Sequence, residues 1–183
     1  MTTHLPGDFV RGIRLFHGLT SEQIQRLLDA SKEVSYADGQ SIFEEGAAGR
    51  ALYILIEGKV RISLVSPVLT STELLTLGPQ ESFGESSFFH RSAHHATADC
   101  LTPVRVIRLQ RSKYEELLEN DDLAALKLAA NAADLLGERL QQTDEWIEQM
   151  LHGRQDAELA TKWRKFRIGI RASHSGAAGG FRP

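Results

Sequence analysis

The chain has 183 residues, of which 42% are hydrophobic and 25% charged, so it can bury a core and is not a disordered chain. Its formal net charge is −3, but the charges are unevenly distributed along the chain. Residues 161–183 carry six Lys or Arg and no Asp or Glu. The single cysteine, Cys100, excludes an intrachain disulfide and fits a reducing compartment. The sequence contains neither a signal-peptide pattern nor a run of about 18 apolar residues. We therefore expect a cytoplasmic protein without a transmembrane segment.

The N-terminal part of the chain predicts a short leader followed by a helix. Residues 1–11 are expected to form a flexible leader. Thr20 and Gln23 have the spacing of a capping box, in which each side chain pairs with a backbone N–H at the start of a helix. Three apolar residues then share one helical face: Ile24, Leu27 and Leu28.

Between Val34 and Leu109 the sequence consists of short apolar runs separated by glycines. The predicted strands are Ser41–Glu44, Leu52–Ile56, Val60–Leu64, Glu73–Leu77, Thr97–Cys100 and Val104–Leu109. Strands this short and evenly spaced are typical of an antiparallel barrel, jelly roll or sandwich.

The stretch from Phe83 to Ala98, called the cassette below, carries the strongest functional signal. It predicts a strand end, a sharp turn at Gly84, one short helix and a return strand. The backbone amides of Ser86 and Ser87 would open the helix, where unpaired N–H groups attract an anion. Glu85 can accept hydrogen bonds from sugar hydroxyls.

The cassette resembles the phosphate-binding cassette of cyclic-nucleotide-binding domains, as in the catabolite activator family and the regulatory subunits of cyclic-AMP-dependent protein kinase. The family pattern is matched by Phe83-Gly84-Glu85, by the length of the short helix and by Ala96-Thr97. The resemblance extends over residues 12–150. It implies an α+β fold with an antiparallel β-roll of the double-stranded jelly-roll type over residues 12–120. An N-terminal helix and long C-terminal helices would flank this roll. The implied ligand is cAMP, cGMP or another cyclic nucleotide, and the implied role is regulatory, with no catalytic residues.

One residue departs from the family pattern. His94 stands where the family places the arginine that pairs with the cyclic phosphate. Histidine is mostly neutral above its reference pKa of about 6.5, and losing a charge-assisted pair typically costs about 2–4 kcal/mol of binding free energy. We therefore expect weak or absent binding of cyclic nucleotides, unless the phosphate protonates His94, Arg91 takes over, or the pocket accepts another anion. His95 adds bulk and a second donor. No metal site is expected at these histidines, because acidic or cysteine ligands at supporting spacing are missing.

A long helix is predicted over residues 121–152, beginning at Asp121 or Asp122 and reaching about Leu151, with Gly153 as the stop signal after it. A heptad seam runs along it: Leu126, Ala130, Ala133, Gly137, Leu140, Asp144, Ile147 and Leu151. The seam either packs on the β-roll or forms a homodimer. By the family resemblance, Thr143 and Asp144 are candidate contacts to the base.

The remaining residues, 153–183, form a basic and partly disordered tail. Trp163 and Phe166 alternate with basic residues, so this tail either packs on the body or binds an anionic surface or an unknown protein partner. It is too short for the DNA-binding domain of the activators. Two functions remain open: a regulatory module that senses a nucleotide or other anionic ligand and signals through its C-terminal helices, or a degenerate scaffold for dimerisation or protein docking.

Overall fold

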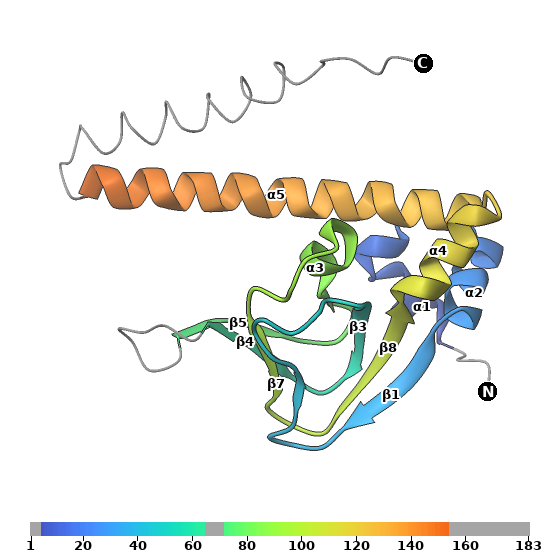
Figure 1. Ribbon diagram of the computed structural model, residues 1–183, viewed down its shortest axis with the longest axis horizontal. Helices are drawn as coiled ribbons and strands as arrows, with labels where there is room; N and C mark the ends of the chain where they lie inside the picture. The colour runs from blue at the N-terminus through green and yellow to red at the C-terminus, as the bar shows by residue number, and fades with distance from the viewer. Residues whose placement is uncertain (1–4, 65–71, 154–183) are drawn as a thin grey trace, which may run out of the picture. The chain divides into compact units, whose positions relative to one another are not determined.

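The computed structural model describes residues 5–64 and 72–153 of the chain (Figure 1). The helical elements are α1 (Gly7–Arg11), the 3-10 helix η1 (Arg14–Phe16), α2 (Ser21–Asp29), α3 (Glu85–His90), α4 (Arg111–Glu119) and α5 (Leu123–Gly153). The strands are β1 (Lys32–Tyr36), β2 (Ser41–Phe43), β3 (Ala51–Glu57), β4 (Val60–Leu64), β5 (Thr72–Leu77), β6 (Ser82–Phe83), β7 (Thr97–Cys100) and β8 (Val104–Gln110). The chain divides after Leu136 into two compact units.

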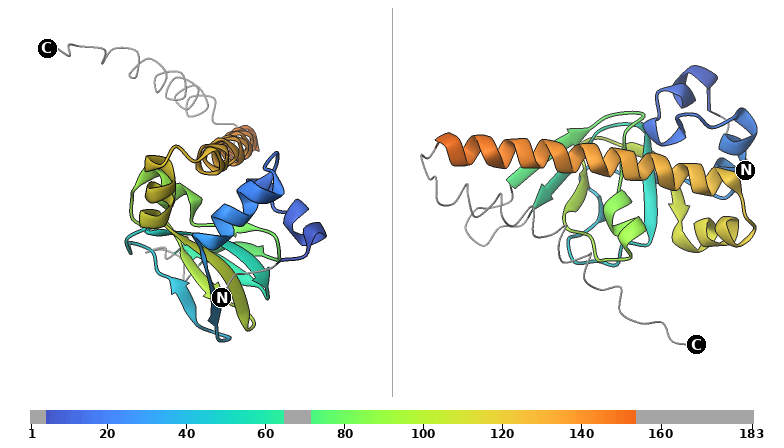
Figure 2. Two further views of the ribbon diagram at one scale, coloured as in Figure 1. Left: turned by 90° about the vertical axis from the view of Figure 1, so that its right-hand side faces the viewer. Right: turned by 90° about the horizontal axis from the view of Figure 1, so that it is seen from above.

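The strands form two antiparallel four-stranded sheets, with the orders β1-β8-β3-β6 and β2-β7-β4-β5 (Figure 2). Their inner faces share one apolar core, to which Leu55 and Val106 of the first sheet and Val60 and Ala98 of the second contribute. Successive side chains of a strand point to opposite faces, so each strand supplies this core with alternate residues. The predicted α+β fold with an antiparallel β-roll is confirmed.

A second core lies between the outer face of the first sheet and the helices. Leu52 and Ile107 project from β3 and β8 into this core, where Leu15, Leu27 and Phe88 meet them. Both faces of β3 are therefore covered, which explains why its sequence is an apolar run that ends only at Glu57. The cassette helix α3 is held against the roll through Phe88.

The structure reproduces each of the six predicted strands to within about two residues and adds β1 and β6. Residues 7–11, expected to belong to a flexible leader, instead form α1, and Phe9 and Val10 pack against the helical core. These two apolar side chains gain burial there, which a leader composed of polar residues would lack.

Two predicted helix starts are confirmed. The Thr20 hydroxyl accepts a hydrogen bond from the Gln23 amide at 3.2 Å, and the Gln23 side chain accepts one from the Thr20 amide at 3.0 Å. At the start of α5, the Asp122 carboxylate accepts a hydrogen bond from the Ala124 amide at 2.8 Å. Asp122 rather than Asp121 therefore caps the long helix.

Within the first unit, the buried face of α5 is not the predicted seam. The buried face consists of Ala124, Ala125, Leu128, Ala132 and Leu135. Leu126, a seam residue, is 53% exposed, and Ala130 and Ala133 are also exposed. The interpretation that the seam packs on the β-roll is therefore wrong for this part of α5. In the second unit, Leu140 is 64% exposed.

Candidate functional site

The glycine turn that opens the cassette is present and requires glycine. Gly84 precedes α3 in a left-handed conformation, with φ 82°, which non-glycine residues rarely adopt. A Cβ atom at this position would lie 3.1 Å from the Ala51 carbonyl oxygen and 3.3 Å from Cδ2 of Tyr53. The turn therefore brings the backbone of the cassette against the start of β3.

Glu85, which directly follows the turn, is 1% exposed, and its Oε1 accepts a hydrogen bond from the Ser82 hydroxyl at 2.5 Å. This bond supplies one of the hydrogen-bond donors that a buried carboxylate requires. Ser87 is also buried, whereas Ser86 is exposed. The four consecutive residues predicted at the site, Gly84 to Ser87, thus form the turn before α3 and the start of this helix.

Arg111, the first residue of α4, fixes the cassette helix in place. Its guanidinium donates hydrogen bonds to the carbonyls of Ser87 at 2.8 Å and Phe88 at 3.1 Å, and to the carbonyl of Gly49. A cation is favoured at this C-terminal end of α3, where the helix dipole is negative. The charge of Arg111 is therefore committed to the fold of the cassette.

His94 projects from the loop after α3 and is 5% exposed. Its ring stacks on Phe43, with centroids 3.6 Å apart and planes 6° apart. Its Nδ1 lies 2.8 Å from the hydroxyl of Ser87, which donates a hydrogen bond to the Gly84 carbonyl at 3.1 Å. Because that hydroxyl has one proton, this arrangement requires Nδ1–H to donate to Ser87. Nε2 is then the atom that gains a proton when the ring becomes cationic.

Burial lowers the pKa of His94, and the neighbouring His95 lowers it further. Desolvation disfavours the charged form of any buried base. Without a bound anion, the pocket therefore favours the neutral imidazole. An anion next to Nε2 would act in the opposite direction and stabilise the imidazolium.

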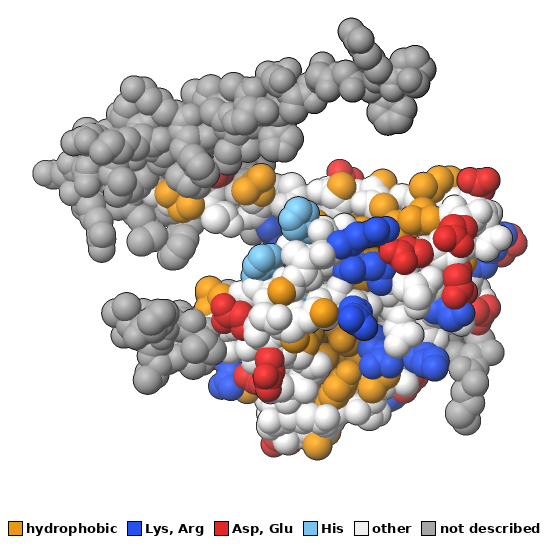
Figure 3. All heavy atoms as spheres, viewed as in Figure 1, with side chains coloured by type: hydrophobic (Ala, Val, Ile, Leu, Met, Phe, Trp, Pro, Cys, Tyr) orange, Lys and Arg blue, Asp and Glu red, His pale blue; other side chains and the backbone are white. Residues whose placement is uncertain are grey.

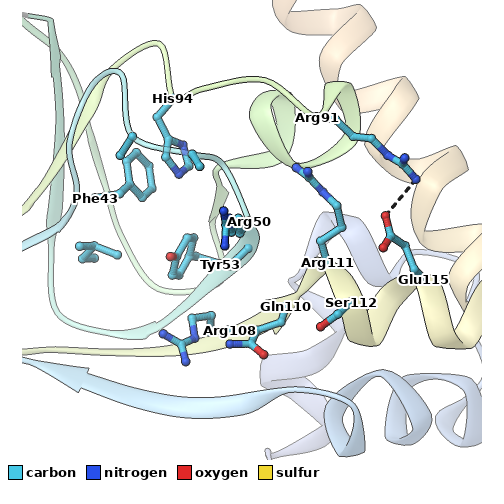
Figure 4. Close-up of a pocket in the computed structure, with 14 residues that line it drawn as sticks. Phe43, Arg50, Tyr53, Arg91, His94, Arg108, Gln110, Arg111, Ser112 and Glu115 are labelled. Atoms are coloured by element: carbon cyan, nitrogen blue, oxygen red, sulfur yellow. Dashed lines mark hydrogen bonds and ion pairs between the residues drawn. The ribbon is translucent and has the colours of Figure 1, made fainter.

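A cavity of about 740 Å³ lies on the inner face of the roll, bordered by the cassette loop, β3, β8 and α4. Figure 4 shows His94 and Phe43 on one side of it, Arg108 on β8 across from them, and Arg50 and Tyr53 between them in this view. Figure 3 shows a group of basic side chains on the face in view, with acidic side chains beside part of this group. A cavity with this volume, aromatic walls and several cations suits an anionic ligand with a flat ring.

The aromatic wall and the strand arginines were not identified from the sequence. Tyr53 lies opposite Arg108 across β3 and β8 and stacks on Phe83 with centroids 5.1 Å apart, and burial raises its pKa to about 12. One sequence signal could have identified Arg108: it follows Val104 and Val106 at period two, so it faces the inside of the roll. A charged residue in an inward position of a strand indicates a polar function there.

The structure brings together most of the predicted site residues. His94 lines the cavity, Ser87 contacts His94, and Gly84 abuts the lining residues Ala51 and Tyr53. His95 is exposed, with Nε2 3.4 Å from the Ser92 hydroxyl. Thr143 and Asp144 lie on α5 in the second unit, so their predicted contact with a base stays a prediction. The basic tail over residues 154–183 lies outside the described residues.

Among residues 5–64 and 72–153, no group of three or more His, Cys, Asp or Glu side chains could hold a metal ion. Likewise, no helix there has both the length and the apolar character that a membrane span needs.

Residues 33–121 match the family model described as cyclic nucleotide-binding domain. The chain is 34% identical over 135 residues to the cyclic AMP receptor protein of Thermus thermophilus, which covers 74% of this chain and 61% of the relative. It is 33% identical over 97 residues to a CRP-like cAMP-activated global transcriptional regulator of Mycobacterium tuberculosis, covering 53% of this chain and 43% of the relative. The chain thus spans less than two thirds of either relative.

Solved structures give the same result. The catabolite activator protein of Thermus thermophilus superposes with a TM-score of 0.68 at 31% identity, covering 75% of this chain and 62% of that chain. The N-terminal domain of a transcriptional regulator from Streptomyces coelicolor superposes with a TM-score of 0.64 at 32% identity, covering 75% of this chain and 96% of that domain.

Proposed function

The chain belongs to the cyclic nucleotide-binding domain family, and on this premise we propose that its cavity binds a cyclic nucleotide or a related anionic nucleotide and that the chain is a regulatory module. The main support for this proposal is the cavity inside the roll. His94 of the cassette reaches this cavity, and arginines and aromatic rings line it. The Gly84 turn and the buried Glu85 give the cassette the backbone path that the family resemblance implies.

His94 takes the phosphate-binding position in this proposal, at a cost in affinity. Its pKa is lowered by burial, so binding an anion must either proceed without its charge or drive its protonation. Because protonated His94 can donate from Nε2 while Ser87 accepts from Nδ1, protonation requires no rearrangement of the Ser87 bond. Affinity for cyclic mononucleotides should accordingly be weak at neutral pH and increase as the pH falls.

Calorimetric titration with cAMP and cGMP at pH 5.5 and 7.5 tests this function. Both the wild type and His94→Arg are titrated, and His95→Arg serves as a control because it adds the same charge at an exposed neighbouring position. We expect tighter binding at the lower pH, and a gain of about 30-fold or more for His94→Arg alone. Equal affinities at both pH values would contradict the role of His94, and no binding by either arginine variant would contradict the function.

In this proposal α5 mediates both the assembly of the protein and its signalling. Its seam is exposed at Leu126 and Leu140, as a helix that pairs with a second copy requires. We propose a homodimer through this seam, with ligand occupancy transmitted along α5. Sedimentation of the wild type and of Leu140→Lys measures the assembly, since a wild-type monomer at micromolar concentration would refute the dimer. Hydrogen exchange along α5 with and without ligand measures the coupling.

The second candidate function, a scaffold whose pocket binds no nucleotide, is favoured by one observation. The one charged group that the family uses for the phosphate is replaced by a buried base with a lowered pKa. A scaffold would show the dimer without any heat of nucleotide binding, and α5 would exchange hydrogen at the same rate with and without nucleotide. The titrations above therefore decide between the two functions.

A further inference from the structure

Four arginines line the cavity, and the structure separates them into two pairs. Arg111 is committed to three backbone carbonyls of the cassette and of the loop before β3. Arg91 forms an ion pair of 2.9 Å with Glu115, which lines the same side of the cavity. The positive charge on the α4 side is thus already compensated by protein groups.

The charges on the strand side are not compensated in this way. Arg108 contacts the Tyr36 hydroxyl, and its Nε is buried without a hydrogen-bond partner among the described residues. Arg50, at the entry to β3, is exposed and forms no ion pair with any described residue. Neither guanidinium is paired with a carboxylate of the described residues, so both leave a positive charge available to an anion in the cavity.

The position of this second pair matters because it lies apart from the cassette. Arg108 belongs to β8 and Arg50 to the start of β3, whereas His94 reaches the cavity from the loop after α3. Figure 4 shows Arg108 across the cavity from His94. One phosphate group at the cassette therefore leaves the guanidinium of Arg108 to a second anionic group.

We propose that Arg50 and Arg108 bind a second anionic group of the ligand, so that the preferred ligand is a nucleotide with two separate phosphate groups rather than a cyclic mononucleotide. This inference rests on the proposed function, because it concerns the same cavity. A guanidinium is a planar and permanently charged donor that suits phosphate oxygens. The volume of about 740 Å³ lies in the upper half of the range of small-molecule sites and accommodates the additional group.

The test compares two nucleotides that differ only in this respect. Cyclic AMP joins the 3′ and 5′ oxygens of adenosine through one phosphate, and adenosine 3′,5′-bisphosphate carries a separate phosphate on each of them. Calorimetric titration at pH 7.5 should give at least about 10-fold tighter binding of the bisphosphate, the effect of one additional charge-assisted bond. Arg108→Gln and Arg50→Gln should each lower the affinity for the bisphosphate by a larger factor than the affinity for cyclic AMP, and so reduce this preference.

Lys113→Gln is the matched control, because it removes one positive charge from α4 at a residue that does not line the cavity. It should preserve the preference for the bisphosphate. Equal or tighter binding of cyclic AMP would overturn this inference and leave the proposed function standing, as would a preference that survives in Arg108→Gln and Arg50→Gln. Binding of neither nucleotide would overturn both.

Discussion

Replacing Gly84 by alanine tests whether the cassette turn is built as described. The residue has φ 82°, and an added Cβ would lie 3.1 Å from the Ala51 carbonyl oxygen and 3.3 Å from the Tyr53 ring. Neither neighbour can move freely, because Ala51 belongs to a central strand and the Tyr53 ring stacks on Phe83. Backbone strain and the close contacts should therefore both destabilise the folded state of the variant.

The magnitude follows from these two contributions. A left-handed conformation costs a non-glycine residue roughly 1–2 kcal/mol, and forcing additional atoms into a packed site costs about 1–3 kcal/mol. Gly84→Ala should thus lower the free energy of unfolding by about 2–5 kcal/mol. Gly39 separates the two contributions, because it has φ 74° and no atom within 4 Å of an added Cβ. Gly39→Ala should cost only the backbone contribution of about 1–2 kcal/mol.

Urea unfolding of the wild type and both variants, followed by circular dichroism, provides the comparison. Equal slopes in denaturant would justify comparing the midpoints. If Gly84→Ala is no more destabilising than Gly39→Ala, the close approach of the cassette to β3 is refuted. The variant would also show whether the turn matters for ligand binding, since the displaced Tyr53 ring lines the cavity.

Three further predictions follow from the described contacts. Thr20→Ala removes the capping box of α2 and should lower the free energy of unfolding by about 0.5–2 kcal/mol in urea titrations; no change would mean that water replaces the cap. Burial lowers the pKa of His94 in the folded state, so the unfolded chain takes up this proton first as the pH falls below about 6.5. Unfolding curves at pH 7.5 and 5.5 should therefore show a loss of stability at low pH that is smaller in His94→Gln, and an equal loss in both proteins would exclude this histidine as a cause. Arg111→Met leaves carbonyls of the cassette helix without their charged donor and should cost about 1.5–3 kcal/mol in thermal or urea unfolding, whereas Lys113→Met on the same helix should change little.

The sequence was sufficient for the fold because local signals and the family resemblance agree. The Thr20 capping box and the strand boundaries depend on neighbouring residues, so both appear in the structure as predicted. The turn at Gly84 could also be predicted from the sequence, because a left-handed backbone conformation strongly favours glycine. In contrast, the face of α5 that packs on the roll uses alanines more than leucines, and a pattern of leucines therefore pointed to the wrong face.

The site was predicted only where it lies on one continuous segment. His94 and its neighbours form the cassette, whereas Phe43, Arg50, Tyr53 and Arg108 come from β2, the entry to β3, β3 itself and β8. Which of these side chains share a cavity depends on strand order and register. Neither can be read from one sequence without knowing which strands are neighbours.

The strand order also determines when this domain can fold during its synthesis. In the first sheet β8 lies between β1 and β3, so these two earlier strands are not joined into one sheet until Val104–Gln110 has been made. The same holds in the second sheet, where β7 separates β2 from β4. Contacts this distant along the chain form slowly, because long loops must close first. A chain stalled on the ribosome before residue 104 would therefore present unpaired strand edges and require chaperones, and the cavity would form only after the last strand is in place.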